Sequence, residues 1–177
     1  MTELSYKETW KGEYKGVAFE VMHWRLGWNY YLLIPAEQLP KEIQPKFNLR
    51  SRTYKLSDDG REYIAFDYGG APIISDLDWH GGITLYEKTR DERGKVVGYR
   101  LGCDYMHLWD ENRTYYLESV VLDAKRSIDV LWERIPNLLM RCSWNGKYYP
   151  EKETYLTEKG ARYAFVNKPK VETPIKS

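Results

Sequence analysis

The stretch "GITLYEKTRDERGKVVGYRLGCDY", residues 82–105, decides the predicted fold. It contains two segments of alternating apolar and polar residues, and this period of two indicates β-strands. The polar loop between them ends at Gly94, which can take the left-handed conformation that a three-residue hairpin loop requires. This register collects apolar side chains on one face, which we expect to pack on the core: Ile83, Leu85, Val97, Tyr99, Leu101 and Cys103.

The opposite face of this hairpin is more polar. It carries Thr84, Tyr86, Lys88, Arg100 and Asp104. If strand pairing continues past Gly82, His80 joins the same face, opposite or diagonal to Asp104. The hairpin therefore predicts that a histidine and a carboxylate from separate segments meet.

A second hairpin is predicted nearer the N-terminus. The segment "YKGVAFEVMHW" (14–24) alternates apolar residues with smaller or polar ones, and "WNYYLLI" (28–34) follows after a turn at Gly27. Pro35 ends the second strand because proline cannot donate to a sheet.

One long amphipathic helix is predicted over about 113–135. Asp110 or Asn112 can cap its start, and Pro136 prevents its continuation. Its apolar residues follow helical spacing and indicate core packing: Leu117, Val120, Val121, Ala124, Ile128, Leu131 and Ile135.

The remaining segments are shorter. Residues 36–60 predict no regular element, "REYIAFDY" (61–68) predicts a short strand, and "SWNGKYY" (143–149) predicts a hairpin through its Asn-Gly turn. "ARYAFVN" (161–167) predicts a last strand, and we expect the tail, 168–177, to be loosely ordered. Together these elements predict an α+β fold: a mainly antiparallel sheet built from hairpins, with the helix packed on one face, in a single domain over 1–167.

Composition and charge exclude some classes of function. The chain has 177 residues, among them 16 Tyr and 7 Trp, and a formal net charge of +1. Aromatic residues suit half-buried sheet surfaces, and they also suit a surface that stacks against a ligand. A protein that grips duplex nucleic acid carries a basic excess, so we expect no extended nucleic-acid partner.

The two cysteines and the N-terminus indicate the compartment. Cys103 and Cys142 form no CxxC pair, which favours a reducing environment and argues against a thiolate zinc site. The N-terminal "MTELSYKETW" lacks an apolar signal core, and no apolar run approaches the length of a membrane span. We therefore expect a cytoplasmic protein without a membrane partner.

Two motifs resemble a known family. "HGGIT" (80–84) and "GCDYMHLWD" (102–110), followed by an amphipathic helix, resemble an uncharacterised family of small bacteriophage and prophage proteins with His-Gly-Gly-Ile/Leu-Thr and then Gly-x-Asp-x-x-His-x-x-Asp. The resemblance spans about 14–135 and includes "GWNYYLLIP" (27–35). Many members have cysteine where Tyr105 stands and a small residue where Trp109 stands. The resemblance implies a phage accessory protein in the host cytoplasm, in a context where small phage proteins counter host defence by binding or destroying nucleotide signals.

The motif residues are also suited to phosphodiester chemistry. His80 and His107 can act as general base and general acid at neutral pH, and Asp104 can fix the tautomer of His80. Arg100 can neutralise charge on a phosphoryl oxygen. The paired glycines can let a phosphate approach the backbone. The predicted ligand-binding residues are Gly81, Gly82, Thr84, Tyr86 and Arg100.

The same motifs leave two other interpretations open. His80, Asp104, His107 and Asp110 form a set of nitrogen and oxygen ligands suited to Zn²⁺ or Mn²⁺. A structural interpretation makes Asp110 a helix cap, His107 a buried histidine and the glycines a β-bulge. His23 has no partner motif, and we interpret it as structural.

Three functions follow from these patterns. The first is a hydrolase that cleaves a phosphodiester or related bond in a small nucleotide-like ligand. The second is a binding protein that sequesters such a ligand through its aromatic residues. The third is a phage protein that docks a host factor through an aromatic patch. The sequence leaves open the ligand's identity, the need for a divalent metal, and whether a homo-oligomer encloses the ligand.

Overall fold

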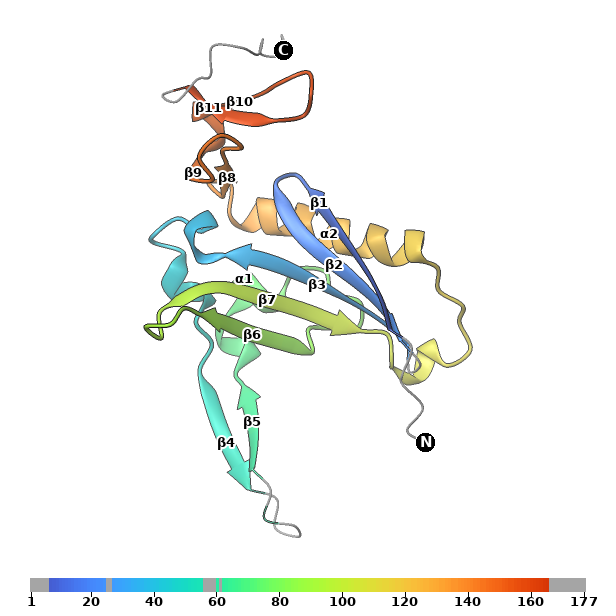
Figure 1. Cartoon of the computed structure of the whole chain (residues 1–177). Coiled ribbons are helices and arrows are strands. Elements are labelled where there is room, and N and C mark those ends of the chain that lie inside the picture. The colour runs from blue at the N-terminus through green and yellow to red at the C-terminus, as the bar shows by residue number, and fades with distance from the viewer. Residues whose placement is uncertain (1–6, 25–26, 56–59, 61, 166–177) are drawn as a thin grey trace.

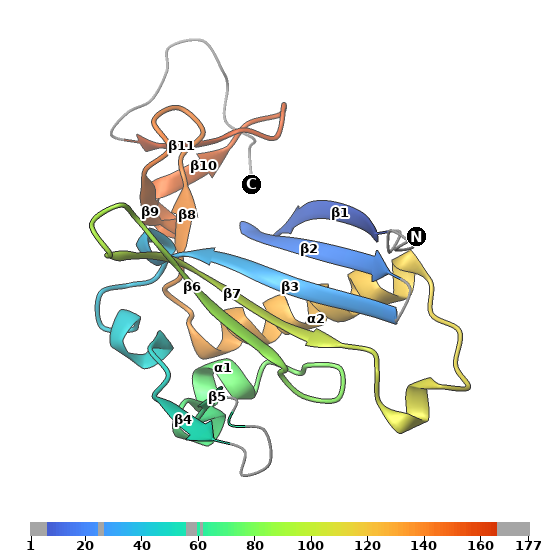
Figure 2. The same cartoon turned by 60° about the horizontal axis from the view of Figure 1, so that its bottom comes forward.

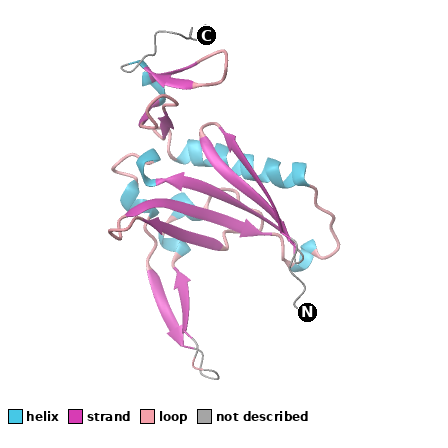
Figure 3. Cartoon of the chain, in the orientation of Figure 1, coloured by secondary structure: helices cyan, strands magenta, loops and turns pink. Residues whose placement is uncertain are grey.

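The computed structural model of the chain describes residues 7–24, 27–55, 60 and 62–165. It confirms the predicted α+β fold: a five-stranded antiparallel sheet, additional hairpins, and the helix α2 (Leu117–Arg134) packed against the sheet (Figures 1 and 3). Within the described residues, no helix is both long and apolar enough to cross a membrane.

The central sheet has the strand order β1-β2-β3-β7-β6. Every neighbouring pair is antiparallel. Its strands are β1 (Lys7–Tyr14), β2 (Val17–Trp24), β3 (Gly27–Pro35), β6 (Leu85–Arg90) and β7 (Val96–Asp104). The two predicted hairpins are therefore confirmed, and they meet through the β3–β7 pair at the centre of the sheet.

The edge strand β1 was not predicted from the sequence. Tyr14 pairs with Val17 across a turn formed by Lys15 and Gly16, whose φ angles are 48° and 78°. Two consecutive residues with positive φ make the tight turn that best matches the twist of a hairpin. Tyr14 therefore ends a separate strand, whereas the alternation pattern had placed it at the start of β2.

The register of the β6–β7 hairpin also differs from the prediction. Arg90 pairs with Val96, as a short loop requires, but Thr89 pairs with Gly98. Val97 is thus an extra residue on β7, a β-bulge, and it shifts all further pairing by one residue. Because side chains alternate between the faces of a strand, this shift exchanges the two faces of β6.

The exchange places Tyr86 in the core, where the prediction had placed Leu85. Tyr86 lies opposite Leu101 and is buried, whereas Leu85 lies opposite Gly102 on the other face. The Tyr86 hydroxyl donates to the Phe47 carbonyl and accepts the backbone N–H of Leu49. Tyr86, which was predicted on the polar face, therefore faces the core and anchors the segment that contains Phe47 and Leu49.

Helix α2 covers one face of the sheet, against β2 and β3 (Figure 2). The buried stripe of the helix matches the predicted stripe, with Val120, Ala124, Ile128 and Leu131 fully buried. Inside this layer the hydroxyl groups of Tyr30 and Ser127 lie 2.8 Å apart and form a buried hydrogen bond. The sheet contributes Val17, Phe19, Val21, Tyr30, Leu32, Ile34, Tyr99, Leu101 and Cys103 to the same core.

Short elements surround this core. The segment between β3 and β6 holds the helix α1 (Pro72–Ser75) and a hairpin of β4 (Ser51–Lys55) and β5 (Glu62–Phe66), which extends away from the sheet (Figure 1). β5 confirms the predicted short strand, whereas β4 falls where no element was predicted.

The chain after α2 forms two further hairpins beyond the end of the helix (Figure 1). They pair β8 (Leu139–Arg141) with β9 (Tyr148–Pro150), and β10 (Thr154–Leu156) with β11 (Arg162–Ala164). Gly146 takes a φ of 71° in the first turn, as the Asn-Gly signal predicts. The predicted tail, 168–177, lies outside the described residues.

Candidate functional site

His80 lies in a turn that precedes β6. Trp79 anchors this turn, because its indole N–H donates to the Ile74 carbonyl at 2.7 Å and its side chain is buried. The backbone N–H of His80 donates to the Tyr30 hydroxyl at 3.4 Å. The imidazole stacks on the Tyr105 ring, with centroids 3.7 Å apart and planes 6° apart. The position and the plane of the His80 ring are therefore both fixed.

His107 lies in the loop after β7, where it precedes the 3-10 helix η4 (Leu108–Asp110). Its ring stacks on Trp109, with centroids 4.3 Å apart. The ring also lies against Gly81, where a Cβ atom would come 2.2 Å from His107 Cε1 and 2.4 Å from Nε2. Gly81 has a φ of 68°, so this position excludes side chains by conformation and by space.

The first of the paired glycines thus makes room for the second histidine. Gly82, with a φ of 103°, has open space where a Cβ would stand. A phosphate could therefore approach the backbone at Gly82, as predicted for both glycines. At Gly81 the His107 ring fills this space.

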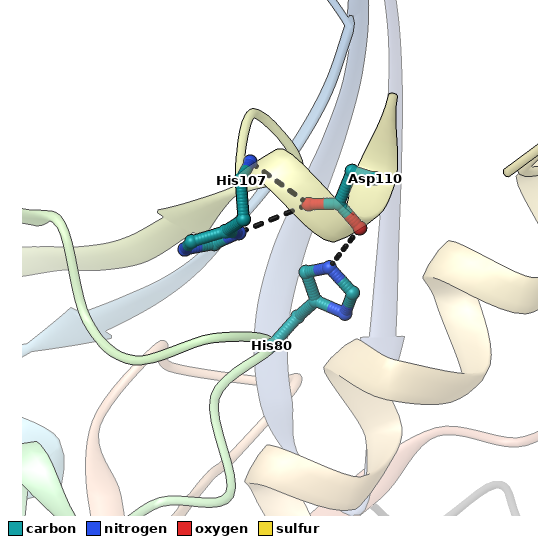
Figure 4. A group of neighbouring side chains, drawn as sticks. All are labelled: His80, His107 and Asp110. Carbon is teal, nitrogen blue, oxygen red and sulfur yellow. Dashed lines mark hydrogen bonds and ion pairs between the residues drawn. The ribbon is translucent and has the colours of Figure 1, made fainter. Parts of the chain in front are cut away.

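Asp110 joins the two imidazoles (Figure 4). Its Oδ1 lies 2.9 Å from His80 Nε2, and its Oδ2 lies 2.9 Å from His107 Nδ1 and 3.0 Å from the His107 backbone nitrogen. The Tyr115 hydroxyl donates a further hydrogen bond to Oδ1. Only 3% of the Asp110 side chain is exposed. We call His80, Asp110 and His107 the His–Asp–His cluster.

The carboxyl group of Asp110 is ionised. Burial raises its pKa, but the hydrogen bonds from Tyr115, His107 and His80 outweigh burial and lower the pKa to about 2. An ionised carboxylate only accepts hydrogen bonds, so each neutral imidazole carries its proton on the nitrogen that faces Asp110. The lone pairs are then on His80 Nδ1 and His107 Nε2, which form no hydrogen bond within the described part of the chain.

Asp104 does not take the role predicted for it. The carboxylate that contacts His80 is Asp110, whereas Asp104 Oδ1 accepts the backbone N–H of Met106 at 3.1 Å. His80 lies in a turn rather than in an extension of β6, and alternation along β7 turns Asp104 away from the face that carries Tyr105. The predicted pair of His80 with Asp104 is therefore wrong. The meeting of His80 with the loop after β7 is confirmed.

Two of the predicted ligand-binding side chains are engaged elsewhere. The Arg100 guanidinium lies 3.8 Å from the centroid of the Tyr31 ring and pairs with Glu20 and Glu87 at 3.4 and 3.5 Å, on the face of the sheet opposite the core. Tyr86 is buried in the core, as described above. Arg100 and Tyr86 are therefore not near the His–Asp–His cluster.

Thr84 and the glycines stay close to the turn that carries His80. The backbone N–H of Thr84 donates to the Gly102 carbonyl at 2.9 Å, and Thr84, Gly81 and Gly82 are exposed. Of the predicted ligand-binding set, Gly81 contacts the cluster directly, and Gly82 and Thr84 follow it in the same exposed segment.

Each histidine of the cluster has an aromatic partner. The Tyr105 ring supports His80, while the Tyr105 hydroxyl donates to Asp123. Burial and this hydrogen bond raise the Tyr105 pKa, so the hydroxyl stays protonated. The Trp109 ring covers His107. In this chain, stacking rings support both imidazoles.

A cavity of about 650 Å³ adjoins the cluster. His107 and Asp110 lie in its wall together with Tyr105. Among the described residues, the rest of the wall combines four rings with one cation and a second carboxylate: His23, Trp24, Trp28, Tyr115, Arg113 and Glu111, together with Gly27, Met106 and Thr114. The His23 ring stacks on Trp28 with centroids 4.0 Å apart, so the histidine interpreted as structural also lines the cavity.

Sequence reasoning missed most of this wall. Trp28, Tyr115 and Arg113 come from β3 and from the segment before α2, and no motif joins them. The detectable signal was the aromatic pair of His23 and Trp28, which lie directly opposite each other at the end of the N-terminal hairpin. An aromatic pair at an open strand end indicates a surface that is not sealed by the core.

Comparisons with protein-family models, with curated proteins and with solved structures give no match for this chain. The geometry of the site therefore carries the functional argument. It combines a buried ionised carboxylate, two oriented imidazoles and an adjoining aromatic cavity.

Proposed function

We propose that this chain is a phage accessory protein that acts in the host cytoplasm on a small nucleotide-like ligand and hydrolyses a phosphodiester or related bond in it. The observation that carries the proposal is that His107 and Asp110 belong both to the His–Asp–His cluster and to the wall of the aromatic cavity. A reactive imidazole therefore borders the space that a ligand would occupy.

The cavity suits a nucleotide in size and in chemistry. Sites for small molecules commonly have volumes of about 300–1,000 Å³, and this cavity has about 650 Å³. The rings of Trp24, Trp28 and Tyr115 in the wall offer aromatic surface against which a base can pack. Arg113 offers a planar cation for a phosphate group. The net charge of +1 favours a small ligand over a long polyanion.

His107 is the general base in this proposal. Neutral His107 carries a lone pair on Nε2, because its Nδ1 proton is donated to Asp110. When Nε2 takes a proton from water or from a ribose hydroxyl, the resulting imidazolium is stabilised by the Asp110 carboxylate.

His80 acts through Asp110 in this proposal. It lies outside the cavity wall and donates to Oδ1, so it holds the carboxylate in place together with Tyr115. The sequence-based expectation gave His80 and His107 equal catalytic roles. The geometry instead favours His107 as the catalytic residue and His80 as a positioning residue.

The test is to incubate the full chain with a panel of linear and cyclic nucleotides and to separate the products by chromatography before and after heating. We expect product that disappears in His107→Ala and is strongly reduced in Asp110→Asn. Asp104→Asn is the matched control, because it removes a nearby carboxylate that does not contact either imidazole. Hydrolysis that survives in His107→Ala, or a panel that is neither cleaved nor bound, would contradict the proposal.

The second candidate function is sequestration without cleavage. The observation that favours it is the extent of aromatic stacking around the cavity, where Trp10, Trp28 and His23 form one stack. Such a wall can bind a base tightly without any chemistry. In the same assay, sequestration predicts intact ligand that is released only after heating.

A further inference from the structure

The His–Asp–His cluster presents three ligand atoms to one another. Nε2 of His80, Nδ1 of His107 and a carboxylate oxygen of Asp110 all lie within 4.8 Å of one another. Each nitrogen is already 2.9 Å from its carboxylate oxygen. A helix cap needs one carboxylate and one backbone N–H, so capping alone does not explain why two imidazoles from separate segments face the same carboxylate.

We propose that His80 Nε2, His107 Nδ1 and Asp110 form a three-ligand site for a divalent transition metal of the zinc class. This inference rests on the same cluster as the proposed function and deepens it, because it names the cofactor of that site. With a metal bound, His107 Nδ1 would be a ligand and Nε2 would carry the proton, so His107 would hold the metal instead of acting as general base. Water activated by the metal would then supply the nucleophile. It also corrects the ligand set expected from the sequence, since Asp104 is excluded and the carboxylate is Asp110.

The distances are compatible with such a metal. Zinc binds imidazole nitrogen and carboxylate oxygen at about 2.0–2.2 Å, so neighbouring ligands of a tetrahedral site are about 3.3 Å apart. The two nitrogen–oxygen separations of 2.9 Å go to different oxygens of Asp110, Oδ1 for His80 and Oδ2 for His107. A carboxylate that binds the metal through one oxygen would therefore turn, while that oxygen and the nitrogen beside it separate by a few tenths of an ångström. The two nitrogens, within 4.8 Å of each other, need to approach.

Proton positions adjust without a net change in charge. Each neutral imidazole now carries its proton on the nitrogen that faces Asp110. A metal takes the lone pair of that nitrogen, so the proton moves through solvent to the other ring nitrogen, Nδ1 of His80 or Nε2 of His107. Asp110 already accepts hydrogen bonds from both imidazoles, from Tyr115 and from the His107 backbone, as a carboxylate does.

The surroundings hold the ligands in place. Tyr105 stacks on His80, Gly81 backs the His107 ring, and Tyr115 donates to the Asp110 carboxylate. Supporting contacts of this kind orient metal ligands and raise affinity. Three protein ligands leave a coordination position open, as in catalytic zinc sites, and a bound metal would lower the pKa of water there. The adjoining cavity gives a ligand access to that position.

The test is metal titration of the full chain after dialysis against EDTA. We expect one Zn²⁺ per chain by elemental analysis, and a visible absorption band on titration with Co²⁺ as spectroscopic probe. We expect His80→Ala, His107→Ala and Asp110→Ala each to weaken Co²⁺ binding at least about tenfold. Asp104→Asn is the matched control and should bind as wild type does, because Asp104 contacts neither imidazole.

Circular dichroism of each variant shows whether it is folded, and the wild-type Co²⁺ band tests the site without any variant. The inference is overturned if wild type binds no stoichiometric metal, or if the folded ligand variants bind Co²⁺ as wild type does. Hydrolysis that persists in EDTA would leave the proposed function intact and remove the metal from it. Stoichiometric metal binding without turnover would support the metal site and contradict the proposed hydrolysis.

Discussion

The imidazole of His107 lies against Gly81 so closely that a methyl group on Gly81 would come 2.2 Å from Cε1. This contact joins the two sequence motifs directly, since Gly81 follows His80 and His107 is linked to His80 through Asp110. Gly81 is therefore part of the site, because only a residue without a side chain leaves room there for the His107 ring.

Replacing Gly81 with alanine tests this contact. We expect Gly81→Ala to displace the His107 ring and to break its Nδ1–H hydrogen bond to Asp110, because the ring occupies the space of the new methyl group. The measurement is the imidazole N–H signals in nitrogen-15 correlation spectra, with unfolding by urea in parallel. Gly94→Ala is the matched control, because Gly94 also has positive φ, at 81°, but open space at its Cβ position. Both variants should lose about 1–2 kcal/mol to backbone strain, and only Gly81→Ala should change the signal of His107.

Asp110 contributes to stability in a way that depends on pH. Its folded-state pKa of about 2 lies below the ordinary value of 3.8. The contribution is therefore fully present above pH about 4 and is lost as the pH falls from about 4 towards 2. A shift of this size corresponds to about 2 kcal/mol. In EDTA we expect Asp110→Asn to be less stable than wild type by about this amount at pH 7, with the difference shrinking below pH about 4.

Urea unfolding at several pH values measures this difference. Asp104→Asn serves as control, because Asp104 accepts only the backbone N–H of Met106 among the hydrogen bonds of the described residues. A gap between wild type and Asp110→Asn that stays constant from pH 7 to pH 2 would refute the role given to the buried carboxylate.

Trp28 tests the aromatic cavity. If a base stacks on this ring, Trp28→Ala should weaken binding of the nucleotide found in the panel by about 1–3 kcal/mol, or about 5- to 150-fold in Kd. Isothermal titration measures the affinity. Trp144→Ala is the matched control, since Trp144 is 67% exposed and lies outside the cavity wall. Equal affinities of the two variants would place the ligand elsewhere.

Tyr86 tests the corrected register of the central hairpin. Its hydroxyl pairs with the Phe47 carbonyl and the Leu49 N–H, and burial raises its pKa to about 12. Tyr86→Phe leaves both buried backbone groups without this partner, so we expect a loss of about 1–3 kcal/mol of unfolding free energy. Hydrolysis and metal binding should not change, because the hydroxyl of Tyr86 bonds to Phe47 and Leu49 and not to the cluster. Urea unfolding measures the loss, and Tyr116→Phe, at a residue that is 65% exposed, is the control.

The main elements of the fold were predictable because each follows from a local pattern. The alternation in 82–105 and 14–34 and the helical stripe of 117–135 are periodic signals, and burial selects them strongly. The strand β1 was not predictable in this way, since its exposed residues are Lys7, Thr9, Lys11 and Glu13, which are typical of a polar edge.

The site was predictable only in part. His80 and His107 could be brought together because both stand in motifs at the ends of paired strands. The partner carboxylate was assigned to Asp104 because strand parity was extended beyond the point where β6 begins. The alternation of side chains along a strand does not indicate where a turn or a β-bulge interrupts the strand, and both occur here. The cavity wall escaped prediction because Trp28, Tyr115 and Arg113 come together only through tertiary packing.

The single additional residue at Val97 has a consequence for how this chain can tolerate insertions and deletions. Residues gained or lost at the exposed tip, 91–95, change only the length of the loop. Deleting Val97 would instead shift the pairing of β6 with β7 by one residue, so that Leu85 would face the core and Tyr86 the opposite side of the sheet. The Tyr86 hydroxyl would then lose its hydrogen bonds to Phe47 and Leu49. The single residue Val97 therefore determines whether the segment that contains Phe47 and Leu49 is attached to the sheet.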